Sequence, residues 1–380
     1  MRALLIGYYG TGNLGDELML YCLRHWLQAQ DIEIDVLSEH PEAVVRSSGL
    51  VAIKNVPLLG EWGWKDAWLR GKAFRLIRSI RSYDLVIGGG GDLLRDDRGW
   101  RSLLYATEKF LAAAALRRPV FLVNVGVGQP HSRHGRALLK LAVRSCRRII
   151  VRDKQSLRVC QELGGGAFTE HLPEIVLSLP AMMGALPPVD LRPPYLAVCL
   201  KGQPNEVGGY ALGEDRLSAL AAVLDRLSEQ RGLQIRFVPF QEGADDRDAE
   251  IHESTARRMR CGRDAVLSKW SDDIVAVSQT IAGARGVLAM RLHAGVLAAA
   301  FGRPCVLMPY DRKVVEFGRE MALEPFLTPE LLDSPDLAFE TVDAALRAER
   351  LPDLTAAQSW RSARLLPLST PPHAAAREEN

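Results

Sequence analysis

The sequence lacks any long hydrophobic run: no window approaches the roughly 20 consecutive apolar residues of a membrane-spanning helix. Its six cysteines form neither a C-x-x-C pair nor a zinc-binding spacing with histidine, so we expect small buried side chains in a reducing compartment. Charge of one sign is also scarce, because 48 Lys and Arg residues against 46 Asp and Glu residues leave a net charge of +2. This balance argues against a protein whose whole surface binds nucleic acid.

What the sequence does have is the composition of an ordinary soluble globular protein, with 47% hydrophobic and 25% charged residues. Its 380 residues exceed the usual size of one domain, and we expect two domains. The first ten residues, MRALLIGYYG, contain an apolar run that is too short for a signal peptide. We therefore expect a first β-strand there, and a cytoplasmic protein.

Short continuous apolar runs alternate with amphipathic stretches through the first half of the chain. Continuous runs are typical of parallel strands buried on both faces, and their alternation with helices predicts a βαβ series. We expect strands at Ala3–Tyr8, Ile34–Leu37, Asp84–Ile87, Val120–Val125 and Ile149–Arg152. We expect helices at Asp16–Gln28, Trp64–Ile80, Ser102–Leu116, Arg133–Cys146 and Lys154–Leu163.

A stretch with five prolines, Leu179–Pro194, interrupts this pattern and has the composition of an interdomain linker. A second α/β series follows, with strands expected at Tyr195–Leu200, Gln234–Pro239, Val287–Met290 and Cys305–Met308. Its helices are expected at Glu214–Glu229, Arg247–Arg260, Asp272–Gly283 and Leu292–Phe301. We therefore expect Rossmann-like domains over 1–185 and 186–350 that face each other across a cleft, and a partly disordered tail over 351–380.

A glycine-rich turn, Gly10–Gly15, follows the first expected strand and precedes a helix. Its G-x-G-x-x-G pattern is, in this context, typical of a dinucleotide-binding turn. However, Asp16 and Glu17 would lie at the helix N-terminus, where their charges repel a pyrophosphate. Asn13 and Asp16 suit the hydroxyl groups of a sugar instead. A capped strand–helix turn that binds no ligand remains the alternative.

A second glycine-rich loop, Gly88–Asp92, follows the expected strand Asp84–Ile87, and the turn Asn124–Gly128 follows the next strand. Glycines let a substrate approach the backbone closely, and their N–H groups can bind an anion. Because both turns lie at the carboxyl ends of expected strands, we favour a binding role. A flexible loop without a ligand is the alternative.

Cationic side chains follow several of the expected strands. Arg152 ends the fifth strand, and Lys313 follows the last one. Arg291 and His293 lie together at a strand-to-helix turn, where a charge is costly unless it has a partner. Together these residues predict a site for a small, multiply anionic ligand. A surface ion pair for Arg152 and a core position for His293 remain the alternatives.

The segment Glu61–Tyr83 combines tryptophan with basic residues at helical spacing. Such a helix can lie on an anionic membrane surface, here the inner face of the cytoplasmic membrane. An ordinary helix that packs on the core and presents a solvated basic face is the alternative. The residues concerned are Trp62, Trp64, Trp68, Arg70, Lys72, Arg75, Arg78 and Arg81.

Five stretches, in the same order along the chain, resemble the polysaccharide pyruvyl transferase family and particularly its cell-surface-anchoring branch. They are GYYGTGNLGDE (Gly7–Glu17), VIGGGGDLL (Val86–Leu94), VRDKQS (Val151–Ser156), MRLHAGVLAAAFGRP (Met290–Pro304) and PYDRKV (Pro309–Val314). The resemblance implies two Rossmann-like domains, as in the GT-B glycosyltransferases. It also implies that phosphoenolpyruvate donates a pyruvyl group to an amino sugar, as a ketal, with release of phosphate. For this branch the resemblance implies, as acceptor, N-acetylmannosamine in a lipid-linked cell-wall glycan precursor, or a nucleotide-linked equivalent.

The resemblance also implies roles for individual residues, and neither a cofactor nor a metal. His293 is the expected general acid and base, since histidine ordinarily titrates near a pH of about 6.5, and Arg291 assists it. The donor would be bound by Arg152, Arg291, Leu292 and Lys313, and the acceptor by Gly12, Asn13, Asp16, Gly90 and Asp92. The chain departs from the family at His171–Glu174, where relatives carry Asp-Pro, and Glu174 is the candidate substitute for that Asp.

Two other functions fit the same fold. A glycosyltransferase would use a nucleotide-sugar donor, with Glu316 as the candidate ligand of its ribose. A non-catalytic module would bind a sugar or a dinucleotide through Gly10–Gly15. Separate titrations with nucleotide-sugars, phosphoenolpyruvate and NAD distinguish the three hypotheses.

Overall fold

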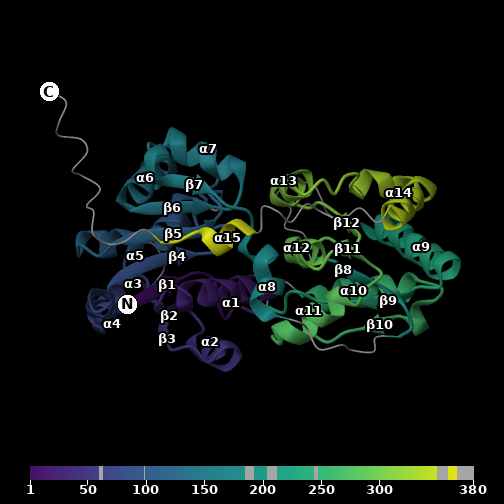
Figure 1. Cartoon of the computed structure of the whole chain (residues 1–380), viewed down its shortest axis with the longest axis horizontal. Coiled ribbons are helices and arrows are strands. Elements are labelled where there is room, and N and C mark those ends of the chain that lie inside the picture. The colour runs from purple at the N-terminus through teal and green to yellow at the C-terminus, as the bar shows by residue number, and fades with distance from the viewer. Residues whose placement is uncertain are drawn as a thin grey trace. The chain divides into compact units, whose positions relative to one another are not determined.

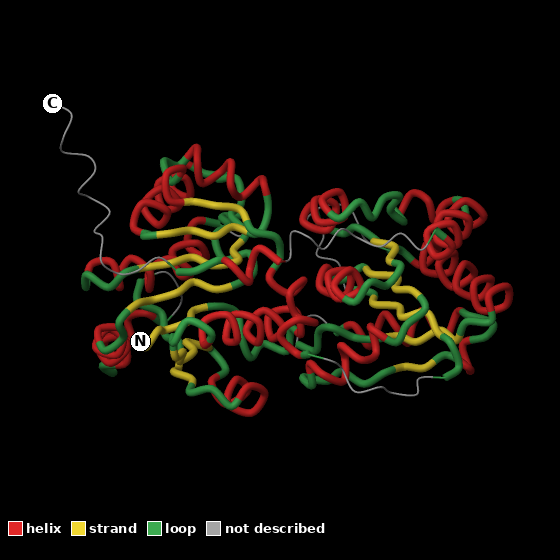
Figure 2. The backbone as a smooth tube through the Cα atoms, in the orientation of Figure 1, coloured by secondary structure: helices red, strands yellow, loops and turns green. Residues whose placement is uncertain are grey.

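The computed structural model describes residues 1–59, 63–97, 99–184, 192–202, 212–243, 247–348 and 358–365. These residues form two compact units. Unit 1 contains Met1–Thr11, Met19–Ile175 and the described part of Ala356–Asn380; unit 2 contains Gly12–Leu18 and the described part of Val176–Thr355. Each unit has a parallel β-sheet covered by helices (Figures 1 and 2). The predicted α/β class with two Rossmann-like sheets is therefore confirmed.

The sheet of unit 1 has seven strands in the order β3-β2-β1-β4-β5-β6-β7. Their bounds are β1 Arg2–Ile6, β2 Glu33–Ser38, β3 Ala52–Lys54, β4 Leu85–Gly89, β5 Val120–Val125, β6 Arg148–Val151 and β7 Thr169–His171. All residues of the central strands β4 and β5 are buried, which is why their sequences are continuously apolar. The order reverses between β1 and β4, and open α/β sheets bind ligands beside such a switch point.

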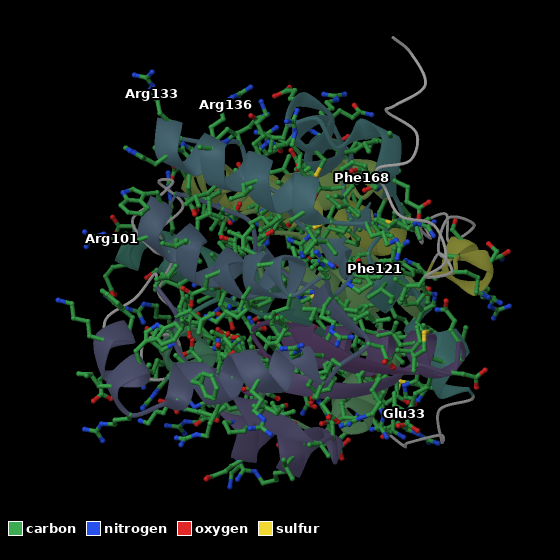
Figure 3. The ribbon with its side chains drawn as sticks, turned by 90° about the vertical axis from the view of Figure 1, so that its left-hand side faces the viewer. Glu33, Arg101, Phe121, Arg133, Arg136 and Phe168 are labelled. Carbon is green, nitrogen blue, oxygen red and sulfur yellow. The ribbon has the colours of Figure 1, made fainter. Side chains whose placement is uncertain are left out.

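The helices of unit 1 pack their apolar faces on this sheet and leave most of their charged side chains outside. Figure 3 shows the contrast: Arg133 and Arg136 of α6 point outward, whereas Phe121 of β5 lies inside. The helices are α1 Leu14–Gln28, α2 Pro41–Ser48, α3 Trp64–Leu69, α4 Lys72–Arg81, α5 Trp100–Ala115, α6 Arg133–Ser145, α7 Lys154–Glu162 and α15 Ser359–Ser362. The first residues of α1 belong to unit 2.

One expectation about unit 1 needs correction. The single helix expected over Trp64–Ile80 is two helices, because Gly71 between them adopts a φ of 64° and breaks the helical hydrogen-bond pattern. The tail over 351–380 was expected to be partly disordered, and its described residues include α15, which buries Trp360 in unit 1. The Trp360 indole donates a hydrogen bond to the carbonyl of Pro173 at 2.7 Å. The expected linker residues 185–191 and the tail residues 366–380 lie outside the described residues.

The sheet of unit 2 has five strands in the order β10-β9-β8-β11-β12. The strands are β8 Tyr195–Cys199, β9 Gln234–Phe237, β10 Val266–Leu267, β11 Gly286–Ala289 and β12 Cys305–Leu307. The helices are α8 Leu179–Met183, α9 Glu214–Arg231, α10 Asp248–Arg258, α11 Ile274–Ala282, α12 Leu292–Ala300, α13 Arg312–Glu320 and α14 Pro335–Arg347. Helix α12 is almost entirely buried, so its sequence is apolar on every side.

Two general findings concern cysteine and membrane insertion. All six cysteines are free thiols, and five of them are buried. Within the described parts of the chain, no helix combines the length and the apolar character that crossing a membrane requires.

Candidate functional site

The residues predicted to bind substrate fall into two groups, one in each unit. The group in unit 2 contains Arg291, His293 and Lys313 together with the glycine-rich turn at Gly12–Leu18. The group in unit 1 contains Gly90, Asp92 and Arg152. Both groups follow the carboxyl ends of parallel strands, the edge at which such sheets bind ligands.

Arg291 is fixed in place by a buried carboxylate. It follows β11 as the N-cap residue of α12, and only 8% of its surface is exposed. Its Nε lies 3.1 Å from both oxygens of Asp248, and its Nη2 lies 2.5 Å from Oδ1. Such a bidentate ion pair fixes the plane of the guanidinium as well as its position. Arg291 is therefore preorganised at the start of α12.

Asp248, which the sequence analysis did not predict, contacts the segments that follow β8, β9 and β11. This side chain is fully buried at the start of α10. Its Oδ1 accepts a hydrogen bond from the backbone N–H of Gly202 at 2.9 Å, after β8. Its Oδ2 accepts from the N–H groups of Phe240 at 2.8 Å and Gln241 at 3.0 Å, after β9. A buried carboxylate with these partners is satisfied, and it ties the ends of β8 and β9 to Arg291.

The glycine-rich turn pairs with the loop that Asp248 orders. The N–H of Leu14 donates to the carbonyl of Phe240 at 2.8 Å, and the N–H of Glu242 donates to the carbonyl of Gly12 at 3.0 Å. Gly12 has a φ of +79°, and a Cβ there would lie 2.3 Å from the Glu242 oxygen. Only glycine fits so close a backbone approach. Asn13 closes the turn, since its Oδ1 accepts from the N–H of Gly15 at 2.9 Å.

His293 lies directly against this turn. A Cβ built on Gly15 would be 2.1 Å from His293 Nδ1, so the imidazole occupies the space of a missing side chain. The structure thus brings together the predicted catalytic histidine and the turn predicted to bind the acceptor. No spacing in the sequence relates residues 15 and 293, which meet only once unit 2 has folded.

Two lysines approach one aromatic ring beside this group. The Nζ of Lys201 lies 5.6 Å, and that of Lys313 5.9 Å, from the ring centroid of Tyr310. Lys201, which the sequence did not indicate, is mostly buried and follows β8. Because β8, β11 and β12 are neighbours, Lys201, Arg291 and Lys313 follow three adjacent strands. This cationic edge suits a ligand with more than one negative group.

His252 on α10 adds a buried neutral imidazole beside the Arg291–Asp248 pair. Its Nε2 accepts a hydrogen bond from the N–H of Leu200 at 3.1 Å. Burial lowers the pKa of His252 to about 4, the charge of Asp248 opposes that shift, and the charge of Arg291 adds to it. His252 is therefore a neutral hydrogen-bond acceptor near pH 7 and supports the end of β8.

In unit 1 the structure joins Arg152 to two carboxylates. Its Nη2 lies 2.5 Å from Asp92 Oδ1, and its Nη1 lies 3.5 Å from Glu174 Oε2. Asn124 orients Glu174, donating to its Oε1 at 2.5 Å and accepting from the backbone N–H of Ile175 at 3.1 Å. Arg152 thus contacts Asp92, a residue predicted for the acceptor, although the sequence had assigned Arg152 to the donor.

Glycines make room for this ion pair. A Cβ on Gly126 would lie 2.3 Å from Asp92 Oδ1, so the expected turn Asn124–Gly128 passes close to the carboxylate. Gly90 has a φ of +69°, and a Cβ there would lie 2.9 Å from the sulfur of Met19. Both loops predicted from their glycines are therefore packed turns rather than open flexible loops.

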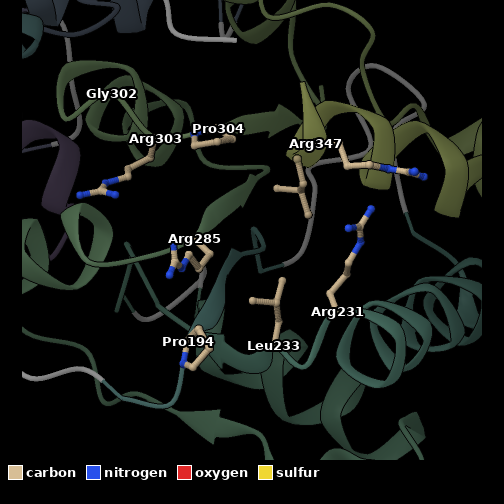
Figure 4. Close-up of a pocket in the computed structure, with 9 residues that line it drawn as sticks. Pro194, Arg231, Leu233, Arg285, Gly302, Arg303, Pro304 and Arg347 are labelled. Atoms are coloured by element: carbon tan, nitrogen blue, oxygen red, sulfur yellow. The ribbon is translucent and has the colours of Figure 1, made fainter. Parts of the chain in front are cut away.

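A pocket of about 730 Å³ lies at the opposite, amino-terminal edge of the sheet in unit 2. Four of its residues directly precede a strand: Pro194, Leu233, Arg285 and Pro304. Figure 4 shows Arg285 and Arg303 on one side of this pocket, and Arg231 and Arg347 on the other. None of the residues predicted to bind substrate lines it, so this pocket is separate from the groups described above.

Two further candidates concern metals and nucleotides. Across the described ranges, no group of three or more His, Cys, Asp or Glu side chains could hold a metal ion. Glu316, the candidate ribose ligand, accepts a hydrogen bond from Arg312 Nε at 2.6 Å, one turn earlier on α13.

A sequence model of the polysaccharide pyruvyl transferase family matches residues 13–312. Among solved structures, the chain is similar to UDP-GlcNAc 2-epimerase from Neisseria meningitidis bound to UDP-GlcNAc, with 10% identity, a TM-score of 0.63, and coverage of 95% of this chain and 98% of that one. For UDP-GlcNAc 2-epimerase from Methanocaldococcus jannaschii the identity is 11%, the TM-score 0.62 and the coverage 95% and 99%. These GT-B neighbours establish the fold alone. No curated protein sequence is significantly similar to the chain.

Proposed function

The chain belongs to the polysaccharide pyruvyl transferase family and is a transferase, and we propose that it moves the pyruvyl group of phosphoenolpyruvate onto a sugar as a ketal. The observation that carries this proposal is the contact of His293 with Gly15, beside Arg291. It joins a proton-transfer group, an oriented cation and a polar turn in one unit. Because free thiols persist in a reducing compartment, we place the reaction in the cytoplasm.

The cationic edge of unit 2 is our candidate site for the donor. Phosphoenolpyruvate carries a carboxylate and a phosphate, and these need more than one cation. Lys201, Arg291 and Lys313 supply three positive charges at adjacent strand ends, of which Asp248 balances one. The backbone of Leu292 begins α12, whose N-terminus adds N–H donors for an anion.

The reaction needs one proton relay. Protonation of the methylene carbon of phosphoenolpyruvate creates the methyl group, and two acceptor hydroxyls bond to the adjacent carbon while its bond to phosphate breaks. Of the two hydroxyl protons released, one replaces the proton delivered to the methylene carbon, and the other leaves with phosphate. We assign delivery and recovery of the first proton to His293, which meets the turn that carries Asn13 and Asp16.

For the acceptor we propose an amino sugar, N-acetylmannosamine in a lipid-linked or nucleotide-linked precursor of the cell-surface-anchoring type. Carboxylate and amide oxygens of Asn13 and Asp16 accept hydrogen bonds from sugar hydroxyls. Asp92, which Arg152 and Gly126 hold in a fixed position, is the second candidate contact. Arg152 then acts by positioning Asp92, since its guanidinium is shared between two carboxylates.

The test is release of phosphate from phosphoenolpyruvate in the presence of a panel of lipid-linked and nucleotide-linked amino sugars. We expect turnover only with an acceptor present, and His293→Ala should reduce it by at least about 100-fold. The matched control is His131→Ala, which removes an exposed imidazole and should leave turnover unchanged. Wild-type turnover by His293→Ala would refute the catalytic assignment.

The same panel distinguishes the glycosyltransferase hypothesis. Calorimetric titration should show binding of phosphoenolpyruvate that weakens in Lys313→Ala. Binding of a nucleotide-sugar together with transfer of its sugar, and no phosphate release from phosphoenolpyruvate, would replace our proposal with the glycosyltransferase.

A further inference from the structure

Large apolar side chains are exposed in one short stretch of unit 1. Leu69 is 88% exposed and Phe74 is 61% exposed, although such residues usually lie in the core. Five of the fourteen large apolar residues that are exposed in the described chain lie within 59–74. We define the α3–α4 surface by these five residues: Leu59, Trp64, Trp68, Leu69 and Phe74.

These side chains are not the core-facing side of their helices. Helix α3 buries Ala67, and α4 buries Ala73, Leu76 and Ile80. The opposite side of α4 therefore carries Phe74 outward while the helix stays anchored on the sheet. The indole N–H of Trp68 donates a hydrogen bond to the carbonyl of Leu58 at 2.9 Å. The exposure is thus built into the packing of both helices.

The same stretch is strongly basic. Residues 63–82 contain six exposed Lys and Arg residues and a single acid, Asp66, which leaves a net charge of +5. The whole chain carries only +2. Asp66 pairs with Arg70 at 2.6 Å, so the remaining cations face solvent around the apolar side chains. They are Lys65, Lys72, Arg75, Arg78 and Arg81.

We propose that the α3–α4 surface docks on a bilayer of anionic lipid. Trp64 and Trp68 suit the boundary between headgroups and acyl chains, where an indole is half in apolar surroundings. Leu69 and Phe74 enter the acyl region, and the surrounding cations attract anionic headgroups. The net charge of +5 over residues 63–82 complements a surface of anionic headgroups, which is why we favour a membrane over a protein partner. The proposal does not depend on the transferase reaction.

The experiment is co-sedimentation of the full chain with vesicles of phosphatidylcholine, with and without phosphatidylserine. We expect binding only when phosphatidylserine is present, and a decrease of that binding as salt is raised. Leu69→Ser with Phe74→Ser, and separately Arg75→Glu with Arg78→Glu, should each reduce the partition coefficient at least about tenfold.

Matched controls change the same residue types elsewhere. Arg133→Glu with Arg136→Glu removes two outward-pointing cations from α6 (Figure 3), and Leu337→Ser removes an exposed leucine from α14. Both controls should bind vesicles as the wild type does. Wild-type binding by either α3–α4 variant, or no binding by the wild type, would overturn the proposal. Phosphate release with a soluble acceptor is measured in parallel and should not change in any of these variants.

Discussion

The packing around Gly15 leaves no room for even one additional carbon atom. The imidazole of His293 occupies the volume that a Cβ at position 15 would need, so the position excludes every residue except glycine. Gly12 is restricted in the same way by the Glu242 carbonyl. The sequence marked both glycines as a binding turn, but it gave no sign that they make room for protein groups from unit 2.

Replacement of Gly15 by alanine should therefore displace His293. A Cβ 2.1 Å from Nδ1 requires the ring to move by more than an ångström, and a misplacement of that size can reduce turnover by about 100-fold. Gly213→Ala is the control, since a Cβ there meets no atom within 4 Å. The measurement is acceptor-dependent phosphate release, and equal rates for the two variants would contradict the contact described.

His252 should make folding stability depend on pH. Its folded-state pKa of about 4 lies below the unfolded value near 6.5, so the unfolded chain takes up this proton first as the pH falls. The contribution of His252 to the free energy of unfolding is complete above about pH 6.5. It decreases as the pH falls from about 6.5 to 4, by about 3 kcal/mol in total.

Urea unfolding of the wild type and of His252→Gln at pH 7.5 and pH 5 measures this effect. Glutamine keeps an acceptor for the Leu200 N–H but does not titrate. Between pH 7.5 and pH 5, the free energy of unfolding of the wild type should decrease by about 2 kcal/mol more than that of the variant. Parallel losses in both proteins would show that His252 is not the titrating group.

At the scale of elements, the strands inside each sheet and the edge strand β12 were predictable, whereas the other edge strands were not. Strand β5 was predicted with its bounds correct, because a strand buried on both faces is continuously apolar. The edge strands β3, β7 and β10 have only two or three residues each and left no such pattern. The break at Gly71 was missed because apolar spacing continues across it. Asp248 was missed because its partners are up to 46 residues away.

Asp248 joins β8, β9 and α12, so its loss should affect all three elements. Asp248→Asn leaves the buried Arg291 guanidinium without a countercharge and should lower the free energy of unfolding by about 3–5 kcal/mol. Asp333→Asn is the control, since this largely exposed carboxylate also forms a two-pronged pair, at 2.9 Å with Arg216. Asp333→Asn should lower the free energy of unfolding by less than about 1 kcal/mol. Urea titration would contradict this reasoning if the two variants were equally stable.

At the scale of the whole molecule, positive and negative charges nearly balance, but they are distributed unevenly along the chain. The stretch 63–82 carries +5 within a chain of +2, and the cations at the ends of β8, β11 and β12 form a second group. Composition alone could not locate either group. Family membership was predictable because five motifs in order are a much stronger signal than any one of them.

The path of the chain has a practical consequence for protein engineering. Residues 12–18 belong to unit 2, and Trp360 is buried in unit 1. A chimera could replace the second half of this protein with that of a relative at a single splice point. Its turn at residues 12–18 would then come from one parent and the residue that replaces His293 from the other, so the two would not fit each other. The chimera would also lose the indole that donates to Pro173. A functional exchange requires three pieces: the turn, the second sheet with its helices, and the original C-terminal helix α15.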